Sequence, residues 1–290
     1  MTAALAPLHI PGFAVTMNIQ TTPGVVGRTG PRLLRKAQRQ LARLRFAATG
    51  RDTRAVFAVG SGRSGTDLVV HCLGQSLEVA VLNEDNPAVF DHWRLRELTI
   101  VRNEIARAGA EIALLKPIVE TQRVAELLDA FPGSRALFIV RHFHDTINSR
   151  VKFFGDSQQG MVDTWLATDF ERFQALPAAV RETVRVAWAV DQSTTTAAAI
   201  AWLVINASYV YLQLHADPRV QLMHYESLVG ESVPCLKRTC DFVGIAYHDR
   251  MTREIYGTSV RRTEPPELPP GLDAACTALW TTLAVPSGSI

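Results

Sequence analysis

The stretch that decides the fold is Val56-Phe57-Ala58-Val59-Gly60-Ser61-Gly62-Arg63-Ser64-Gly65-Thr66. An apolar run of strand type leads into a glycine-rich turn with one arginine, and residues that can begin a helix follow. Such a turn aims backbone N–H groups and a helix N-terminus at one point, which makes an anion-binding site. The alternative, a tight turn that binds nothing, leaves Arg63 without the anionic partner that an arginine requires there. The stretch therefore predicts a phosphate-binding strand–loop–helix unit.

The glycine spacing of this loop is that of the loops that bind nucleoside triphosphates, but two functional residues differ. Gly60 and Gly65 match the pattern, whereas Thr66 stands where the lysine should be. Asp67 stands where the hydroxyl that binds Mg²⁺ should be. Without these two groups the chemistry of the γ-phosphate and its metal is missing. The sequence therefore disfavours a nucleoside triphosphatase and retains the phosphate-binding loop.

A second strand-to-helix connection supports the first. Residues 135–140 contain an apolar run with β-branched members, which is typical of a buried parallel strand. Arg141 follows the run, Asp145 suits the N-cap of the next helix, and Ser149 then lies one turn into that helix. A guanidinium and a hydroxyl so placed can bind one phosphate, although Arg141 could instead form a surface ion pair with Asp145. Because ligands of open α/β sheets bind at the carboxyl ends of strands, we expect Arg63 and Arg141 at one site.

Apolar runs of strand length alternate with helical patterns along the chain. We expect strands at 56–60, 78–83, 112–116, 135–140 and 220–225, and helices at 66–76, near 91–108, and at 121–130, 145–153, 232–243 and 271–283. This alternation implies a parallel sheet with right-handed crossovers. The predicted fold class is α/β: a three-layer α/β/α domain with a central parallel sheet and a helical insertion over the site at about 154–195. The apolar stretch 197–214 contains Asn206, Ser208 and Gln213, which favours a buried helix over a membrane span.

Taken together, these segments resemble one family. Arg63-Ser64-Gly65-Thr66 after a strand resembles the 5′-phosphosulfate loop of the sulfotransferases that use 3′-phosphoadenosine 5′-phosphosulfate (PAPS), and Arg141 with Ser149 resembles their 3′-phosphate motif. Further segments follow in the family's order, namely Ile112–Pro117, Phe131–Arg135, Val220–Val229 and Asp241–Ile245. The resemblance covers residues 55 to about 283, nearly the whole chain.

The resemblance implies a donor site and a donor. The implied donor co-substrate is PAPS, and no metal is implied because arginine and lysine can supply the positive charge that Mg²⁺ supplies in kinases. The implied donor-binding residues are Arg63, Ser64, Gly65, Thr66, Arg141 and Ser149, together with Ser259, Arg261 and Arg262 from a segment near the C-terminus.

Catalysis requires a base for the acceptor hydroxyl and a cation for the leaving oxygen. Glu84 stands twenty residues after Ser64, the placement of the catalytic glutamate in protein-tyrosine and trehalose-type sulfotransferases. A carboxylate in a partly dry cleft has a raised pKa, as a base requires. The alternatives for Glu84 are a helix-capping role, or its replacement as base by Asp85, His71 or His92. Lys116 is the expected partner of the bridging oxygen, a task that Arg63 shares.

Composition sets limits without deciding the function. The chain has 290 residues with 47% hydrophobic and 20% charged residues, as expected of a folded, soluble protein with a sizeable core. Its net charge of +2 gives no reason to expect a nucleic-acid partner. The four cysteines (Cys72, Cys235, Cys240 and Cys276) show no metal-binding spacing. We interpret them as reduced, mostly buried thiols of a cytoplasmic protein.

The N-terminal part is distinct. The predicted division is residues 1–50, a loose arm with a basic amphipathic helix, followed by a single α/β domain at 51–290. Residues 28–54 hold nine basic residues against one acid, Asp52, with leucines at roughly helical spacing. Such a helix usually packs its apolar stripe on the domain and leaves its charges in water. Peripheral contact with an anionic membrane, or with an acidic partner, is the alternative.

Three functions remain open. The favoured one is transfer of a sulfuryl group from PAPS to a hydroxyl of a small-molecule, lipid or glycan acceptor, with a carboxylate base. A non-catalytic nucleotide-binding relative that acts as an interaction module is the second. A phosphotransferase of the nucleotide-kinase kind is the third, and the missing lysine disfavours it. The sequence identifies neither the acceptor nor the oligomeric state.

Overall fold

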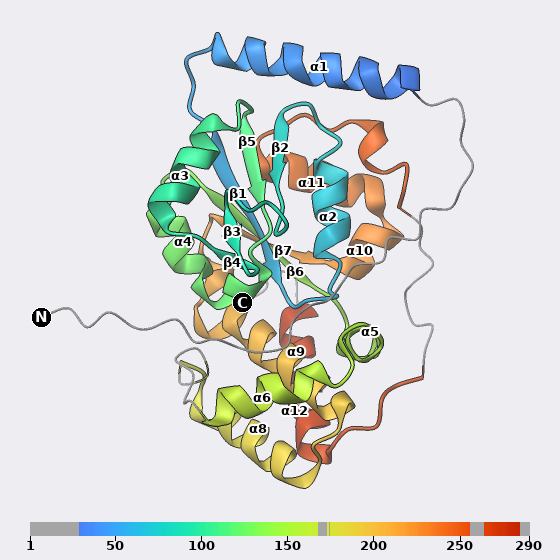
Figure 1. Cartoon of the computed structure of the whole chain (residues 1–290). Helices are drawn as coiled ribbons and strands as arrows, with labels where there is room; N and C mark the ends of the chain where they lie inside the picture. Colours follow the sequence, from blue (N-terminus) through green and yellow to red (C-terminus); the bar gives the residue numbers. More distant parts are fainter. Residues whose placement is uncertain (1–28, 168–172, 174, 256–263, 285–290) are drawn as a thin grey trace, which may run out of the picture.

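The five expected strands form one parallel sheet (Figure 1). The computed structural model describes residues 29–167, 173, 175–255 and 264–284, with side chains from residue 34 onward. The strands are β1 (Arg54–Gly60), β2 (Val79–Leu82), β5 (Ile112–Leu115), β6 (Arg135–Val140) and β7 (Val220–His224). Their order in the sheet is β2-β5-β1-β6-β7. The strand that leads into the glycine-rich loop is therefore the central one.

Helices cover both faces of this sheet. One face carries α2 (Thr66–Leu73), α10 (Tyr225–Gly230) and α11 (Ser232–Val243). The other carries α3 (Leu98–Arg107), α4 (Val124–Ala130), α9 (Thr194–Tyr211) and α12 (Pro270–Ala284). Side chains alternate along β1: Val56 and Ala58 pack in the first core, and Phe57 and Val59 pack in the second. The predicted three-layer α/β/α fold is confirmed.

The apolar helix α9 lies inside the protein. Thirteen of its 18 residues are buried, and Trp202 is fully covered. The amide of Asn206 donates to the carbonyl of Trp202, and the Ser208 hydroxyl donates to the carbonyl of Ile205, so these polar groups bond to the helix's own backbone. Among the described residues, no helix is long and apolar enough to cross a membrane. The prediction of a buried helix at this place is confirmed.

The segment after β6 is helical, as expected. It comprises α5 (Phe143–Phe154), α6 (Ser157–Ala167) and α8 (Ala178–Val190). α5 and α6 pack on α9, and α8 packs on both α9 and α12. In Figure 1 these helices lie beneath the end of the sheet where the glycine-rich loop is found. The four cysteines are buried and free, as predicted.

The segment near 91–108 differs from the prediction. It begins with a short antiparallel hairpin, β3 (Phe90–Asp91) and β4 (Arg94–Leu95), and α3 starts only at Leu98. The two hairpin turn residues, His92 and Trp93, have φ values of 47° and 69°. Left-handed backbone cannot belong to an α-helix. Short 3₁₀ helices complete the fold at Ile118–Arg123, Leu214–Ala216 and Asp249–Met251.

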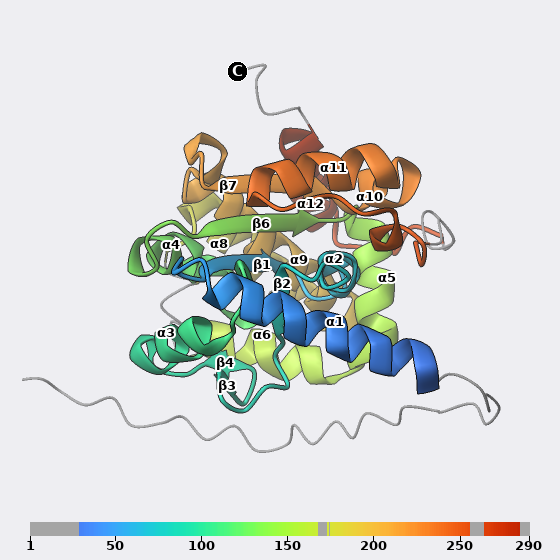
Figure 2. The same ribbon diagram turned by 90° about the horizontal axis from the view of Figure 1, so that it is seen from above.

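The basic helix α1 (Thr29–Ala47) is present, but its orientation contradicts the expectation. Leu34, Leu41 and Leu44 are exposed, so the apolar stripe does not pack on the domain. The helix contacts the body through arginine instead: Arg35 and Arg39 bond to residues just after α2. Figure 1 shows α1 along the top of the molecule, and in Figure 2, seen from above, α1 crosses in front of the rest of the chain.

Candidate functional site

Most of the predicted site residues, and also Tyr225, lie just after the strands. Glu84 follows β2, Lys116 follows β5, the loop 61–65 follows β1, Arg141 follows β6, and Tyr225 follows β7. Because the strands are parallel, these residues meet at one edge of the sheet. The strand order places Glu84 and Lys116 on one side of the loop, and Arg141 and Tyr225 on the other.

Close packing fixes both ends of the loop. A Cβ at Gly60 would lie 2.2 Å from the Ile139 carbonyl oxygen, and one at Gly65 would lie 2.3 Å from the Tyr225 ring. Both glycines also have positive φ values, 139° and 98°. The Thr121 hydroxyl holds the start of the loop, since it accepts from the Gly60 N–H at 3.0 Å and lies 3.1 Å from the Gly60 carbonyl oxygen. Only glycine satisfies the backbone and the packing at these two positions.

The loop has hydrogen-bond donors that no group in the described part of the chain accepts from. Among the described residues, the backbone N–H groups of Arg63, Gly65, Thr66 and Asp67 have no hydrogen-bond partner. The Ser64 hydroxyl is buried and likewise has none there. Arg63 has a φ of 72°, a conformation that is strained for a residue other than glycine. Unused donors around a helix N-terminus are what a phosphate group binds.

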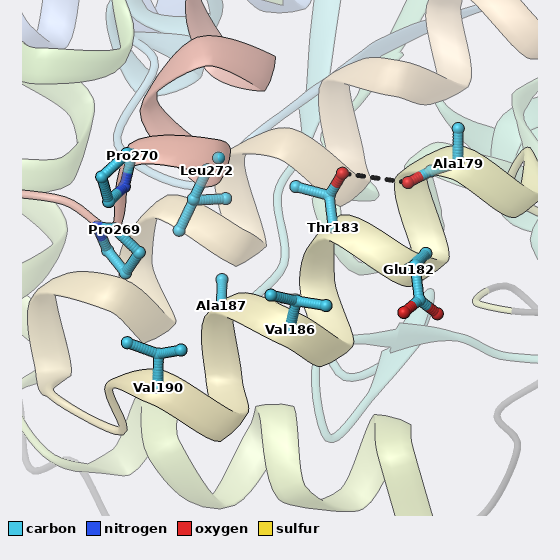
Figure 3. A pocket seen from close by; sticks show the side chains of 10 residues that line it. Ala179, Glu182, Thr183, Val186, Ala187, Val190, Pro269, Pro270 and Leu272 are labelled. Carbon is cyan, nitrogen blue, oxygen red and sulfur yellow. Dashed lines mark hydrogen bonds between the residues drawn. The ribbon is translucent and has the colours of Figure 1, made fainter.

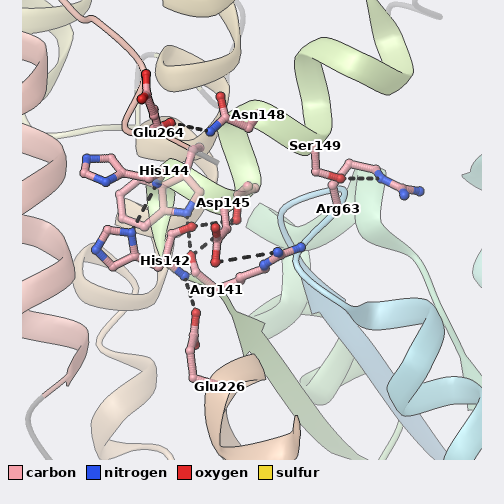
Figure 4. A network of polar contacts seen from close by, with 11 residues as sticks. Arg63, Arg141, His142, His144, Asp145, Asn148, Ser149, Glu226 and Glu264 are labelled. Atoms are coloured by element: carbon pink, nitrogen blue, oxygen red, sulfur yellow. Dashed lines mark hydrogen bonds and ion pairs between the residues drawn. The ribbon is translucent and has the colours of Figure 1, made fainter. Parts of the chain in front are cut away.

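Arg63 and Ser149 come together, although the sequence assigned them to different phosphates. The Arg63 Nε donates to the Ser149 hydroxyl at 3.3 Å (Figure 4). The Arg63 guanidinium also lies 4.4 Å from the centre of the Phe153 ring. α5 therefore holds the loop arginine at the site edge of the sheet.

Arg150 is a site residue that the sequence interpretation missed. Its side chain is 5% exposed, and its Nη1 lies 3.3 Å from the Gly62 carbonyl oxygen and 3.5 Å from the Ser61 hydroxyl. Its Nε donates to the Gln158 side chain at 2.8 Å. Burial, and then the nearby charge of Arg63, lower the pKa of Arg150 to about 10. No carboxylate among the described residues pairs with it, so the loop rests on a buried, uncompensated cation.

Arg141 lies between two elements. Its Nη2 is 3.6 Å from the Asp145 carboxylate, and its guanidinium lies 4.6 Å from the centre of the Tyr225 ring. The Trp202 indole donates to the Arg141 carbonyl at 3.0 Å, which fixes the backbone at the end of β6. The ion pair with Asp145 was the alternative interpretation, and the structure contains it.

The start of α5 corrects the predicted cap. His142, not Asp145, is the N-cap residue, and its Nδ1 accepts from the His144 backbone N–H at 3.3 Å. Because α5 begins at Phe143, Ser149 lies about two turns into the helix rather than one. Asp145 lies in the first turn, where its carboxylate faces Arg141.

Glu226 holds the two strand ends together. Its carboxylate accepts from the His142 backbone N–H at 2.9 Å, so α10 is tied to the start of α5 (Figure 4). Burial raises the pKa of Glu226, and the bond from His142 partly offsets that rise. The sequence interpretation noted the Tyr225-Glu226 segment but gave neither residue a role.

On the other side of the loop, Lys116 contacts two carboxylates. Its Nζ lies 2.7 Å from the Glu84 carboxylate and also pairs with Asp67. The Lys116 and Glu84 side chains are only 7% and 8% exposed, whereas that of Asp67 is 69% exposed. The predicted base and the predicted cation therefore lie together, and Asp67 pairs with Lys116 at the rim.

The proton affinities in this cluster are altered. Burial raises the pKa of Glu84; the Lys116 ammonium opposes this rise and the Asp67 charge adds to it. Burial alone would lower the pKa of Lys116, but attraction to Glu84 and Asp67 outweighs it, so that pKa is raised. Two carboxylates thus share one ammonium, and burial makes Glu84 easier to protonate than an ordinary glutamate.

The alternative bases lie elsewhere or in water. The His71 ring pairs with Glu254 at 2.9 Å, near the far end of α2 from the loop. The His92 side chain is 95% exposed and pairs with its neighbour Asp91. Asp85 is exposed, whereas Glu84 faces Lys116. Of these four residues, Glu84 has the contacts that a base in a covered site requires.

Three predicted donor-binding residues cannot be placed. Ser259, Arg261 and Arg262 lie outside the described residues. Just after them, the Glu264 carbonyl accepts from the Asn148 side chain of α5 at 3.0 Å, beside Ser149 in the chain. Their part in the site remains a prediction.

A separate pocket lies between α8 and the start of α12. It has a volume of about 470 Å³ and is lined mainly by Val186, Ala187, Val190 and the prolines 269 and 270 (Figure 3). Glu182 is the one charged residue in its lining. A pocket without a cation is unsuited to a phosphate-containing donor. It is distinct from the loop site.

Comparison with known proteins gives similarity of fold. No family model and no curated protein sequence matches the chain. The sulfotransferase domain from the curacin biosynthetic pathway is 14% identical, with 79% of this chain and 98% of that chain covered at a TM-score of 0.49. The sulfotransferase domain of the Synechococcus PCC 7002 olefin synthase is also 14% identical, with 79% of this chain and 96% of that chain covered at a TM-score of 0.46. A mouse sulfotransferase complexed with PAP is 14% identical, with 75% of this chain and 71% of that chain covered at a TM-score of 0.40. Because these identities and TM-scores are low, the interpretation of the site rests on the chain's own residues.

Proposed function

We propose that the protein transfers a sulfuryl group from PAPS to a hydroxyl of a small-molecule, lipid or glycan acceptor. The observation that carries the proposal is the arrangement around the loop 61–65. Hydrogen-bond donors suited to a phosphate lie at the centre. Arg63, Ser149 and Arg141 lie on one side of them, and the covered Glu84–Lys116 pair lies on the other. One side suits a nucleotide with two phosphate groups, and the other suits proton transfer.

In this proposal the loop binds the 5′-phosphosulfate. Backbone N–H groups of Gly65 and Thr66 and the Ser64 hydroxyl donate to its oxygens, with Arg63 as the adjacent cation. Arg141 and Ser149 bind the 3′-phosphate, and Ser259, Arg261 and Arg262 complete the donor site. These groups neutralise the donor's charge with guanidinium groups and backbone dipoles, so the binding requires no metal.

The reaction is an in-line displacement at sulfur. The acceptor oxygen forms a bond to sulfur while the bond from sulfur to the bridging phosphate oxygen breaks, and Glu84 takes the acceptor's proton. Negative charge grows on the bridging oxygen, where Lys116 stabilises it. For this, Lys116 must turn from the carboxylates toward the phosphate, and the products are the sulfated acceptor and 3′,5′-adenosine bisphosphate.

One observation favours a second candidate, a non-catalytic nucleotide-binding module. Lys116 is held by two carboxylates, Glu84 and Asp67, which offset its charge and compete with a phosphate for it. If Lys116 stays so held, the loop binds a nucleotide without turnover. The Glu84→Gln variant separates the two functions: turnover collapses by about 10²-fold or more in an enzyme, while donor affinity is unchanged.

The first experiment is calorimetric titration with 3′,5′-adenosine bisphosphate, in parallel with ATP–Mg²⁺. We expect micromolar binding of the bisphosphate alone, lost in Arg141→Ala and kept in Arg107→Ala. Arg107 is the matched control because its side chain on α3 is exposed and pairs with a neighbouring glutamate, Glu104. Binding of ATP–Mg²⁺ instead would contradict the proposal and indicate a phosphotransferase.

A further inference from the structure

The helix α1 presents an apolar stripe to solvent. Leu34, Leu41 and Leu44 are 62%, 49% and 60% exposed. Their spacing, with Ala37 between them, places them on one side of the helix. A surface helix of a globular protein normally turns such a stripe toward the core. The stripe therefore requires an explanation outside the folded body.

Polar contacts fix this orientation. The Arg35 Nη2 donates to the Gln75 side chain at 2.6 Å and lies 3.2 Å from the Gln75 carbonyl oxygen. The Arg39 Nη2 donates to the Gly74 carbonyl at 2.7 Å. Gly74 and Gln75 follow the last turn of α2, where a helix carries partial negative charge that attracts cations. The charged side of α1 is thus bound inward, which leaves the leucines outward.

The charge of α1 selects its partner. The helix has six basic residues and no acidic one: Arg32, Arg35, Lys36, Arg39, Arg43 and Arg45. Lys36, Arg43 and Arg45 are exposed along with the leucines. A second copy of the same helix would bring an equal positive charge against the first. A negatively charged surface with an apolar interior complements both features.

We propose that α1 binds peripherally to the surface of an anionic lipid bilayer, with Leu34, Leu41 and Leu44 at the boundary between headgroups and acyl chains. Lys36 and Arg45 then extend their charges to the anionic headgroups, whereas the stem of Arg43 lies beside Gly109 on the body side. The inference is independent of the proposed sulfuryl transfer, because it uses no residue of the loop site.

The position of α1 sets the orientation of the bound protein. Its contacts are with the end of α2 and lie near Gly109, just before β5, so α1 crosses the amino ends of the strands. The loop site lies at the carboxyl ends, across the seven residues of β1. That length corresponds to about 20 Å. A bilayer at α1 therefore leaves the loop site facing the aqueous phase (Figure 1).

The test is flotation of the full-length protein with lipid vesicles. We expect binding to vesicles of phosphatidylcholine mixed with phosphatidylserine, and little binding to phosphatidylcholine alone. Added salt should lower the bound fraction, because it screens the headgroup charge. The double variant Leu41→Gln/Leu44→Gln should lower the partition coefficient by about tenfold, because it removes the inserted apolar surface.

A matched control uses exposed apolar residues outside α1. Val186 and Val190 on α8 are 54% and 74% exposed, and Val186→Gln/Val190→Gln should bind vesicles as the wild type does. Failure of the wild type to float with anionic vesicles overturns the proposal, as does equal binding by the α1 variant. A dimer in light scattering that the α1 variant loses, without vesicle binding, assigns the stripe to self-association instead. Titration with the bisphosphate is a separate readout that reports the loop site alone.

Discussion

Asp67 contributes to the ionisation of the Glu84–Lys116 pair although it lies at the rim of that pair. Its carboxylate pairs with Lys116 and is one cause of the raised pKa of Glu84. The sequence places Asp67 where a hydroxyl is usual, and its partner could not be predicted. That contact depends on side-chain directions in α2 and after β5, two segments that are far apart in the sequence.

The pH dependence of turnover tests this cluster. Glu84 accepts a proton only when it is ionised, so its raised pKa places the acidic limb of kcat/KM above the ordinary glutamate value of 4.5. Asp67→Asn removes a negative charge that raises this pKa, so the limb should move to lower pH. The control Asp129→Asn removes an exposed charge paired with Arg219 and should leave the profile unchanged. A limb that moves to higher pH in Asp67→Asn contradicts the assignment.

Arg150 supports the loop with a charge that no carboxylate of the described residues compensates. Arg150→Gln should weaken bisphosphate binding by about tenfold, because it removes one cation from the phosphate site. The melting temperature should stay the same or rise, because the variant also removes a buried charge beside Arg63. Calorimetry and thermal unfolding measure the two effects. Unchanged affinity with a lower melting temperature would mean that Arg150 only packs the loop.

At the scale of elements, strands and loop were predictable and contacts between helices were not. The strands are short apolar runs, and the loop glycines have steric requirements that a sequence displays. The hairpin at 90–95 was missed because its turn residues, His92 and Trp93, are not the usual glycine or asparagine. Arg150 was missed because one arginine in a helix gives no sign of whether it faces water or the core.

Gly65 connects the loop with α10, and a methyl group tests that connection. Gly65→Ala would place a Cβ 2.3 Å from the Tyr225 ring at a φ of 98°. We expect a loss of about 1–3 kcal/mol in the free energy of unfolding and loss of bisphosphate binding. Gly160→Ala in α6 is the control, because its Cβ meets nothing within 4 Å and alanine favours a helix. Denaturant titration compares the two, and equal stability would show that the loop is free to shift.

At the scale of the whole molecule, the alternation of strands and helices predicted the three layers but not the strand order. The strand order depends on where each crossover connection places the next strand in the sheet. This order separates the Glu84–Lys116 pair from Arg141. The amphipathic pattern of α1 predicted which residues share a face. The prediction that the apolar face turns to the body was wrong, because the orientation depends on the carbonyl groups of Gly74 and Gln75.

The predicted boundary at residue 50 is tested by truncation. Two arginines of α1 make its hydrogen bonds to the body among the described residues, so residues 51–290 should fold alone. We expect a melting temperature lower by no more than about 4 °C and unchanged bisphosphate affinity. Vesicle binding should be lost. An unfolded product in circular dichroism would place the first fifty residues within the domain.

Because Lys116 is enclosed, it differs in reactivity from the other lysines of the protein. The chain has four lysines, and Lys36, Lys152 and Lys237 are exposed while Lys116 is covered. A covered amine with a raised pKa is protonated and therefore a poor nucleophile. Acylating reagents thus modify the three exposed amines first and reach the fourth when the pair with Glu84 opens. The labelling rate of the peptide that contains Lys116 then reports how often this lysine leaves its carboxylates.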